Sequence, residues 1–90
     1  MRRTLVLALL LTSCEDDDQV KGQAALERHV ERNRVGMDGD HWIEMQNAIG
    51  EWERTGLIFG YLGDYDECVK AIAGLKAANP GRKYRCLPAN

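Results

Sequence analysis

The sequence predicts a small α+β domain in its C-terminal half, and three adjoining segments indicate it. Residues 57–62 form a short apolar and aromatic run between Gly56 and Gly63, which is typical of a buried strand. Residues 64–78 have the apolar periodicity of a helix, and residues 83–87 can return as a further strand. The 90 residues of the chain are enough for one such domain with a marginal core.

The predicted helix carries its own start and stop signals. Asp64 can serve as the N-cap, with Glu67 three residues later as the second member of an Asp version of the capping box. Asn79-Pro80-Gly81 is expected to end the helix and turn the chain. The apolar positions that fall on one helical face are Cys68, Ala71, Ile72, Leu75 and Ala78.

Composition excludes some classes of partner. The chain is 44% hydrophobic and 29% charged, which is ordinary for a soluble domain, and its formal net charge is -2. Such a charge gives no general affinity for a polyanion, so neither DNA nor RNA is expected as a partner.

The N-terminus has the pattern of a secretory signal. A short positive head, Met1-Arg2-Arg3, precedes the apolar residues 4–12. This apolar segment is too short for a membrane span, because a bilayer core needs about 20 apolar residues in a helix. We therefore expect residues 1–13 to be a signal peptide.

The end of that signal, Leu11-Thr12-Ser13-Cys14, resembles the lipobox of bacterial lipoproteins. The resemblance implies that Cys14 is alkylated with diacylglycerol, that the chain is cut just before it, and that the protein is anchored to a membrane of the cell envelope. Several acyl chains, at about 0.8 kcal/mol per buried methylene, give stable anchoring. The anchored protein would face the periplasm or the cell exterior. The alternative is an ordinary signal peptide with a cysteine near its cut, which would leave the protein secreted.

An acidic run, Glu15-Asp16-Asp17-Asp18, follows the predicted anchor. Loss of Arg2 and Arg3 with the signal would take the formal net charge from -2 to -4, and acidic side chains beside anionic headgroups repel. We interpret the run as a solvated spacer. It lacks the alternating ligands and the glycine of a calcium loop.

Residues 19–36 contain good helix formers and end at Gly36, which predicts a surface or spacer helix. The turn formers in residues 35–41 mark a domain boundary. We therefore divide the mature chain into an anchor, spacer and tether over residues 14–39 and a compact domain over residues 40–90. The apolar stripe of the tether helix is thin and consists of Ala24, Leu26 and Val30.

The remaining cysteines are expected to pair. With Cys14 assigned to lipid by the resemblance, Cys68 and Cys86 are left, one in the first turn of the helix and one in the returning strand. Their disulfide would close a loop of about 19 residues and contribute about 3 kcal/mol in an oxidising compartment. One alternative, a zinc site with His29 or His41, lacks closely spaced paired ligands, and another, a reactive thiol, would have to escape its oxidised partner.

Residues 41–54 allow two interpretations. Residues 41–46 could form a strand, yet the large apolar side chains of the segment are spaced for one helical face, with Asp40 as a cap. Periodicity alone favours the helix. The side chains concerned are Trp42, Met45, Ile49 and Trp52.

The C-terminal half also loosely resembles the C-terminal module of small exported bacterial and phage proteins. The resemblance rests on Trp42, on the glycine-flanked aromatic strand, on Tyr65-Asp66-Glu67-Cys68 and on Tyr84-Arg85-Cys86-Leu87-Pro88. In that module, strands precede a helix that starts near a cysteine, and a last strand ends in Cys-x-Pro. The resemblance implies a β-β-α-β arrangement and favours strands in the ambiguous segment, but it implies no activity.

The residue types for acid and base catalysis are present without a motif that would organise them. Gly36 to His41 resembles a flexible site loop, but the single serine, Ser13, lies in the signal, and there is no nucleophile elbow, phosphate-binding glycine motif or metal triad. We expect neither an enzyme nor a cofactor or metal. The acid and base types are His29, Asp38, Asp40, His41, Glu44 and Glu51.

The sequence therefore predicts a lipid-anchored, non-enzymatic protein of interaction or structural type that meets an envelope protein. Exposed aromatic side chains are its expected contacts, because aromatic residues dominate interface energetics; for the tryptophans, core packing is the competing role. The alternative is a small secreted inhibitor or immunity-type protein that acts on an envelope enzyme or a phage component. The expected contacts are Trp42, Trp52, Tyr61 and Tyr65.

Overall fold

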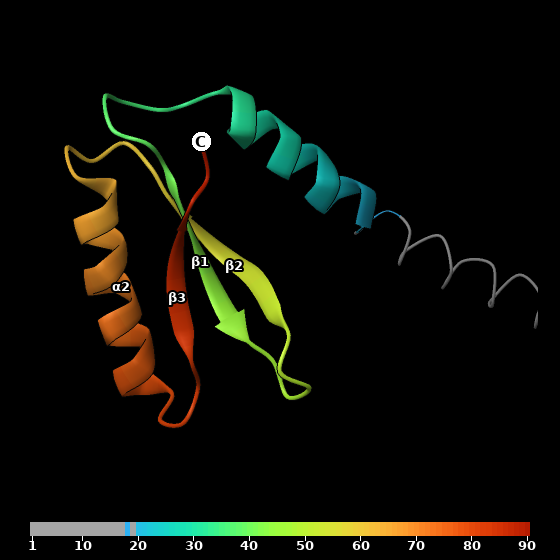
Figure 1. The fold of residues 1–90 in the computed structure, drawn as a ribbon, viewed down its shortest axis with the longest axis vertical. Coiled ribbons are helices and arrows are strands. Elements are labelled where there is room, and N and C mark those ends of the chain that lie inside the picture. Colours follow the sequence, from blue (N-terminus) through green and yellow to red (C-terminus); the bar gives the residue numbers. More distant parts are fainter. Residues whose placement is uncertain (1–17, 19) are drawn as a thin grey trace, which may run out of the picture.

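The α+β fold class is confirmed by a computed structural model, which describes residue 18 and residues 20–90 (Figure 1). The predicted signal peptide, Cys14 and the acidic residues before Asp18 lie outside the described residues. Within the described part, no helix is long and apolar enough to cross a membrane.

A helix over residues 20–32, here the N-terminal helix, precedes a β-β-α-β domain. The strands form one antiparallel sheet of order β2-β1-β3, so the first strand lies at its centre. The β-β-α-β arrangement is thus confirmed, and the helical alternative for residues 41–54 is wrong. The elements are β1 (His41–Gln46), β2 (Trp52–Ile58), α2 (Asp64–Ala78) and β3 (Tyr84–Pro88).

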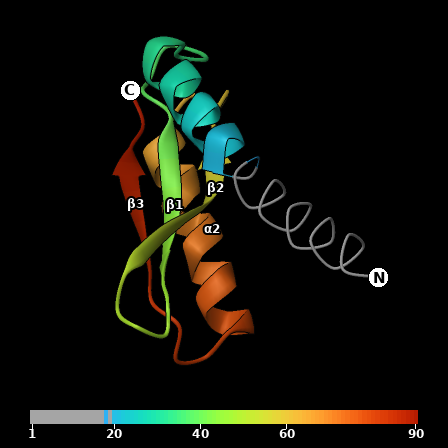
Figure 2. The same cartoon turned by 90° about the vertical axis from the view of Figure 1, so that its right-hand side faces the viewer.

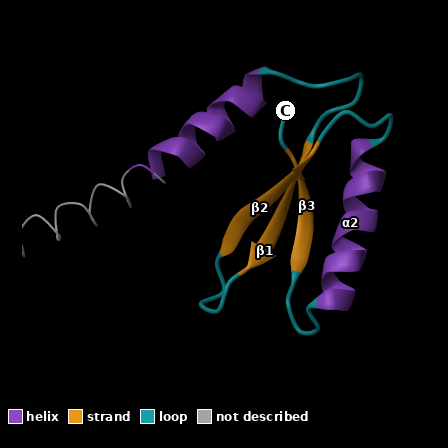
Figure 3. Cartoon of the chain, turned by 180° about the vertical axis from the view of Figure 1, so that it is seen from behind, coloured by secondary structure: helices purple, strands orange, loops and turns teal. Residues whose placement is uncertain are grey.

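The sheet has a small core on each face. Trp42 and Ile43 are neighbours in β1 and point to opposite faces, and both are buried. On one face, Ile43 packs with residues of α2 and β3, including the fully buried Cys68. On the other face, Trp42 packs with Val30 of the N-terminal helix and with Ala89. The two helices therefore cover different faces of the sheet (Figures 2 and 3).

Helix α2 ends where the sequence predicted and begins differently. Asn79 closes its C-terminus, because its backbone N–H donates to the Leu75 carbonyl at 2.9 Å. At the other end Gly63 is the N-cap and makes no side-chain cap bond, so the predicted capping box at Asp64 is wrong. Asp64 Oδ1 instead accepts from the Tyr61 N–H at 2.9 Å, which fixes the loop before the helix.

The apolar run that predicted a strand over residues 57–62 is mostly loop. Strand β2 begins earlier, at Trp52, and ends at Ile58. Gly60 then adopts φ 83°, a left-handed conformation that breaks strand pairing and favours glycine. The second half of the run therefore leaves the sheet with its large side chains exposed.

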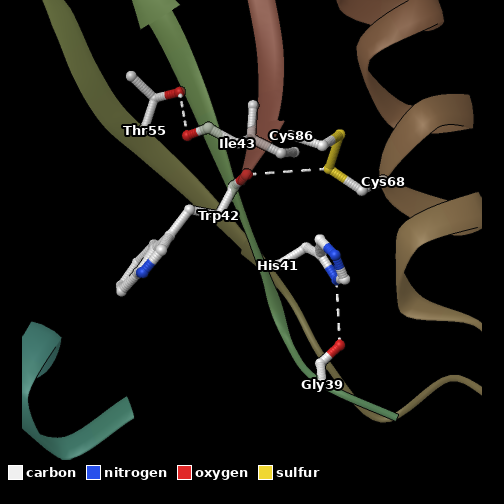
Figure 4. Close-up of a disulfide and its surroundings, with 7 residues drawn as sticks. All are labelled: Gly39, His41, Trp42, Ile43, Thr55, Cys68 and Cys86. Atoms are coloured by element: carbon white, nitrogen blue, oxygen red, sulfur yellow. Dashed lines mark hydrogen bonds between the residues drawn. A yellow bond between two sulfur atoms is a disulfide. The ribbon is translucent and has the colours of Figure 1, made fainter. Parts of the chain in front are cut away.

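The predicted disulfide between Cys68 and Cys86 is present, and it joins the first turns of α2 to β3 (Figure 4). The two Cα atoms are 6.2 Å apart, and 18 residues separate the cysteines in the sequence. Cys68 Sγ also lies 3.9 Å from the Trp42 carbonyl oxygen. We regard this as a van der Waals contact, because a disulfide sulfur has no hydrogen to donate.

The N-terminal helix is fastened to the domain by Asn90. The Asn90 side-chain amide donates to the Val30 carbonyl and to Asp40 Oδ2, each at 2.9 Å, and its Oδ1 accepts from the Asp40 N–H. Val30 itself is only 5% exposed. These contacts cross the predicted boundary between residues 39 and 40, so the C-terminal end of the N-terminal helix packs as part of the folded unit.

Candidate interaction surface

Large apolar side chains gather at the end of the molecule where two loops meet. Within the described residues, ten large hydrophobic side chains are exposed, and six of them lie in or beside the loops before β1 and after β2. Leu62 is 89% exposed and Met37 is 86% exposed. We call this surface the apolar end; it consists of Val35, Met37, Phe59, Tyr61, Leu62 and Tyr65.

The two loops of the apolar end lie against each other (Figure 1). A Cβ built on Gly60 would lie 4.0 Å from Val35 Cγ1, and one built on Gly36 would lie 3.9 Å from the Tyr61 carbonyl oxygen. Gly36 and Gly60 both have φ between 80° and 90°, so both loops bend at residues that tolerate this conformation. The residues before β1 and those after β2 therefore form one continuous surface.

Two buried carboxylates hold these loops. Asp64 accepts from the Tyr61 N–H, and Asp40 Oδ2 accepts from the Val35 N–H at 3.1 Å. Asp40 and Asp64 are at most 1% exposed, so the surrounding protein holds both side chains in place. A hydrogen bond formed away from water is electrostatically stronger than one in water, so these two bonds keep the exposed apolar side chains in a defined arrangement.

A shallow hollow continues the apolar end toward the N-terminal helix. It has a volume of about 240 Å³, and its walls are mainly apolar. Val35 and Phe59 belong both to the hollow and to the apolar end, while Val30 and Leu57 lie deeper in the domain. The apolar end thus offers projecting side chains and a recess beside them.

Tyr65 and His41 extend the same surface onto α2. The two rings are in an edge-to-face arrangement with centroids 5.4 Å apart. His41 Nδ1 lies 3.0 Å from the Gly39 carbonyl, which can only accept, so this nitrogen is the donor (Figure 4). His41 therefore positions the Tyr65 ring, while Tyr65 stays 56% exposed.

Neither tryptophan belongs to the apolar end; both lie on the face of the sheet that the N-terminal helix covers. Trp42 is 5% exposed, which matches its alternative role in core packing. Trp52 is half-buried, and the Arg85 guanidinium carbon lies 4.2 Å from the centroid of its ring. Of the four expected contacts, Tyr61 and Tyr65 are thus brought together on one surface, and the tryptophans are not.

The same face carries a charge network that the sequence analysis missed. The Glu44 side chain is 7% exposed; its Oε1 accepts from Arg85 Nε at 2.8 Å, and its Oε2 lies 3.4 Å from Arg54 Nε. Arg54 also pairs with Glu27 of the N-terminal helix at 3.3 Å. Its guanidinium carbon lies 5.0 Å from the centroid of the Trp42 ring. The network is neutral overall and links the N-terminal helix to all three strands.

A β-bulge makes this network. Ile43 pairs with Gly56, but Glu44 pairs with Arg54, so Thr55 is an extra residue in β2. The Thr55 hydroxyl lies 3.4 Å from the Ile43 carbonyl (Figure 4). Strict alternation would place Leu57 and Arg54 on opposite faces. The extra residue places the side chains of Leu57 and Arg54 on the same face as Trp42. The regular alternation of side chains along a strand does not predict this placement from the sequence.

The side chains suited to acid and base catalysis either make other contacts or lie exposed and apart from one another. Asp40 holds a loop and the chain end, Glu44 is held by two arginines, and His41 lies against Tyr65. His29 and Asp38 are exposed. Within the described part of the chain, no group of three or more His, Cys, Asp or Glu side chains could hold a metal ion.

Comparison with known proteins adds no relative. No protein-family model matches the chain, and no curated protein and no solved structure matches it at a significant level.

Proposed function

We propose that the protein is a lipid-anchored, non-enzymatic component of the cell envelope that works by binding another protein through its apolar end. The observation that carries this proposal is the gathering of six exposed apolar side chains on loops held by buried carboxylates. Exposed hydrophobic residues scattered singly are ordinary, but six of them on two adjoining loops favour an interaction site.

The arrangement supports association in a second way. The residues that project most, Leu62 and Met37, come from two different loops, and the hydrogen bonds of Asp64 and Asp40 restrain those loops before any partner arrives. Preorganised loops lose less conformational entropy on binding. Aromatic rings next to the projecting side chains supply the large contact area that interface hot spots use.

The lipid anchor is proposed on the lipobox at Leu11-Thr12-Ser13-Cys14. We expect the Cys14→Ala variant to carry no acyl chains and to keep residues 1–13, because the cut before residue 14 depends on the lipidated cysteine. The mass of the wild-type protein should correspond to residues 14–90 plus acyl chains. Cys68 and Cys86 serve as an internal control, because both should resist alkylation without reductant in either variant. A wild-type chain that still carries Met1 and no lipid would contradict the anchor and leave the binding surface to be judged separately.

The binding surface is tested by site-specific photo-cross-linking in intact cells. A photoreactive phenylalanine analogue at Leu62 is expected to give a discrete cross-linked product. The same analogue at Ile49 should give none. Ile49 is the matched control, because it is 77% exposed and apolar but lies in the β1–β2 turn at the opposite end of the sheet. Equal products from both positions, or none from Leu62, would rule out the apolar end as the binding surface.

A further inference from the structure

We infer that the protein bound by the apolar end is a second copy of this chain, in a two-fold dimer; this inference rests on the function proposed above. It starts from an imbalance in the domain. Within the described residues, only six hydrophobic side chains are fully buried, seven partly buried ones pack against them, and ten large ones are exposed. Small domains with so little buried surface are commonly stabilised by disulfides, metals or oligomerisation, and here one disulfide is present.

The area of the apolar end suits a dimer. The three aromatic side chains of the apolar end would each bury about 150–250 Å² when fully covered, and its three aliphatic side chains somewhat less. Because all six are 46–89% exposed, they present together on the order of 600 Å². Two such surfaces would bury roughly 1,200 Å² in total, which is the lower limit for a specific interface. A single copy would leave a patch at the upper end of what monomers expose.

The shape of the surface is self-complementary. In a two-fold interface the same patch contacts itself, so each projection needs a recess on the same surface. The apolar end has both: Leu62 and Met37 project, and the hollow of about 240 Å³ opens beside Val35 and Phe59. A projecting side chain of one copy can therefore enter the hollow of the other.

Charge does not oppose this pairing. The exposed charged residues that flank the apolar end in the sequence include both signs. When two copies meet, the apolar ends are therefore not surrounded by charges of one sign only. Charges of one sign on two identical surfaces would repel each other. The proposed anchor at Cys14 would also confine the copies to one membrane and raise their effective concentration. The flanking charges are Arg34, Asp38, Asp66 and Lys70.

The test uses the full chain and tells a second copy from a different protein. Two versions with different C-terminal tags are expressed together, with the photoreactive analogue at Leu62 of one version, and the cells are irradiated before lysis. We expect one product of twice the chain mass that carries both tags. The analogue at Ile49 should give no such product. Phe59→Asp in both versions should lower the two-tag product about tenfold, the size expected for loss of an interface anchor.

Each outcome has a defined meaning. A Leu62 product that carries one tag and a foreign mass overturns self-association while the proposed binding function stands. No product from Leu62 overturns both. Two-tag products from Leu62 and Ile49 in equal yield indicate crowding in the membrane and overturn the inference. The Phe59→Asp variant is checked for its far-ultraviolet circular dichroism and for protected Cys68 and Cys86; a variant that fails this check is replaced by Leu62→Asp with the analogue at Met37, judged by the same criterion.

Discussion

Replacing Cys68 and Cys86 by alanine is expected to lower the free energy of unfolding by about 3 kcal/mol. The two cysteines are 18 residues apart in the sequence, and their disulfide reduces the conformational entropy of the unfolded chain. Domains of this size are marginally stable, so the loss is a large part of the total. Urea unfolding followed by tryptophan fluorescence measures it. Both tryptophans lie on the sheet and report on its integrity.

The control for this experiment is reductant. Dithiothreitol should lower the urea midpoint of the wild-type protein to near that of the double alanine variant, and it should leave the double variant unchanged. A wild-type midpoint that does not respond to reductant after prolonged unfolding would mean that the disulfide contributes nothing to stability.

Trp42→Ala is expected to cost about 3–5 kcal/mol, the usual range for deleting a buried aromatic side chain. Trp42 connects Val30 of the N-terminal helix with Leu57 and Ala89, and Arg54 stacks on its ring. Its removal should therefore also release the N-terminal helix. We expect faster amide exchange over residues 20–32 than over α2 in this variant.

Trp52→Ala is the matched control for Trp42→Ala. Trp52 is half-buried and is stacked by one guanidinium, that of Arg85, so its replacement should cost no more than about 1–2 kcal/mol. Amide exchange of the N-terminal helix should be unchanged. Equal losses in the two variants would show that the N-terminal helix does not depend on the packing of Trp42.

The elements that could be predicted from the sequence are those with local signals. Helix α2 has apolar periodicity and a stop signal at Asn79-Pro80-Gly81, and the structure ends it at Ala78. The strand that carries Cys86 was predicted within one residue at each end. The pairing of Cys68 with Cys86 followed from the number of cysteines and from the assignment of Cys14. These features need no knowledge of long-range packing.

The candidate site was predicted only in part: Tyr61 and Tyr65 were expected contacts, but the exposure of the whole run was missed for a physical reason. An apolar run between glycines normally indicates burial, and this rule placed Phe59, Tyr61 and Leu62 in a strand interior. The structure exposes all three, because Gly60 turns the chain and Asp64 fixes the loop. An apolar run that is exposed and not buried is expected at functional or strained sites. The network around Glu44 was missed because it depends on one extra residue in β2.

The bonds of Asn90 set the order in which the domain can form. Strand β1 lies at the centre of the sheet, yet one of its neighbours, β3, is provided only by residues 84–88. The bond from Asn90 to the Val30 carbonyl spans 60 residues of sequence. Neither core is complete without residues 84–90, so a chain that emerges from its N-terminus can close neither core until these residues have emerged. For the exported protein proposed above, such late closure would keep the chain unfolded until it has crossed the membrane.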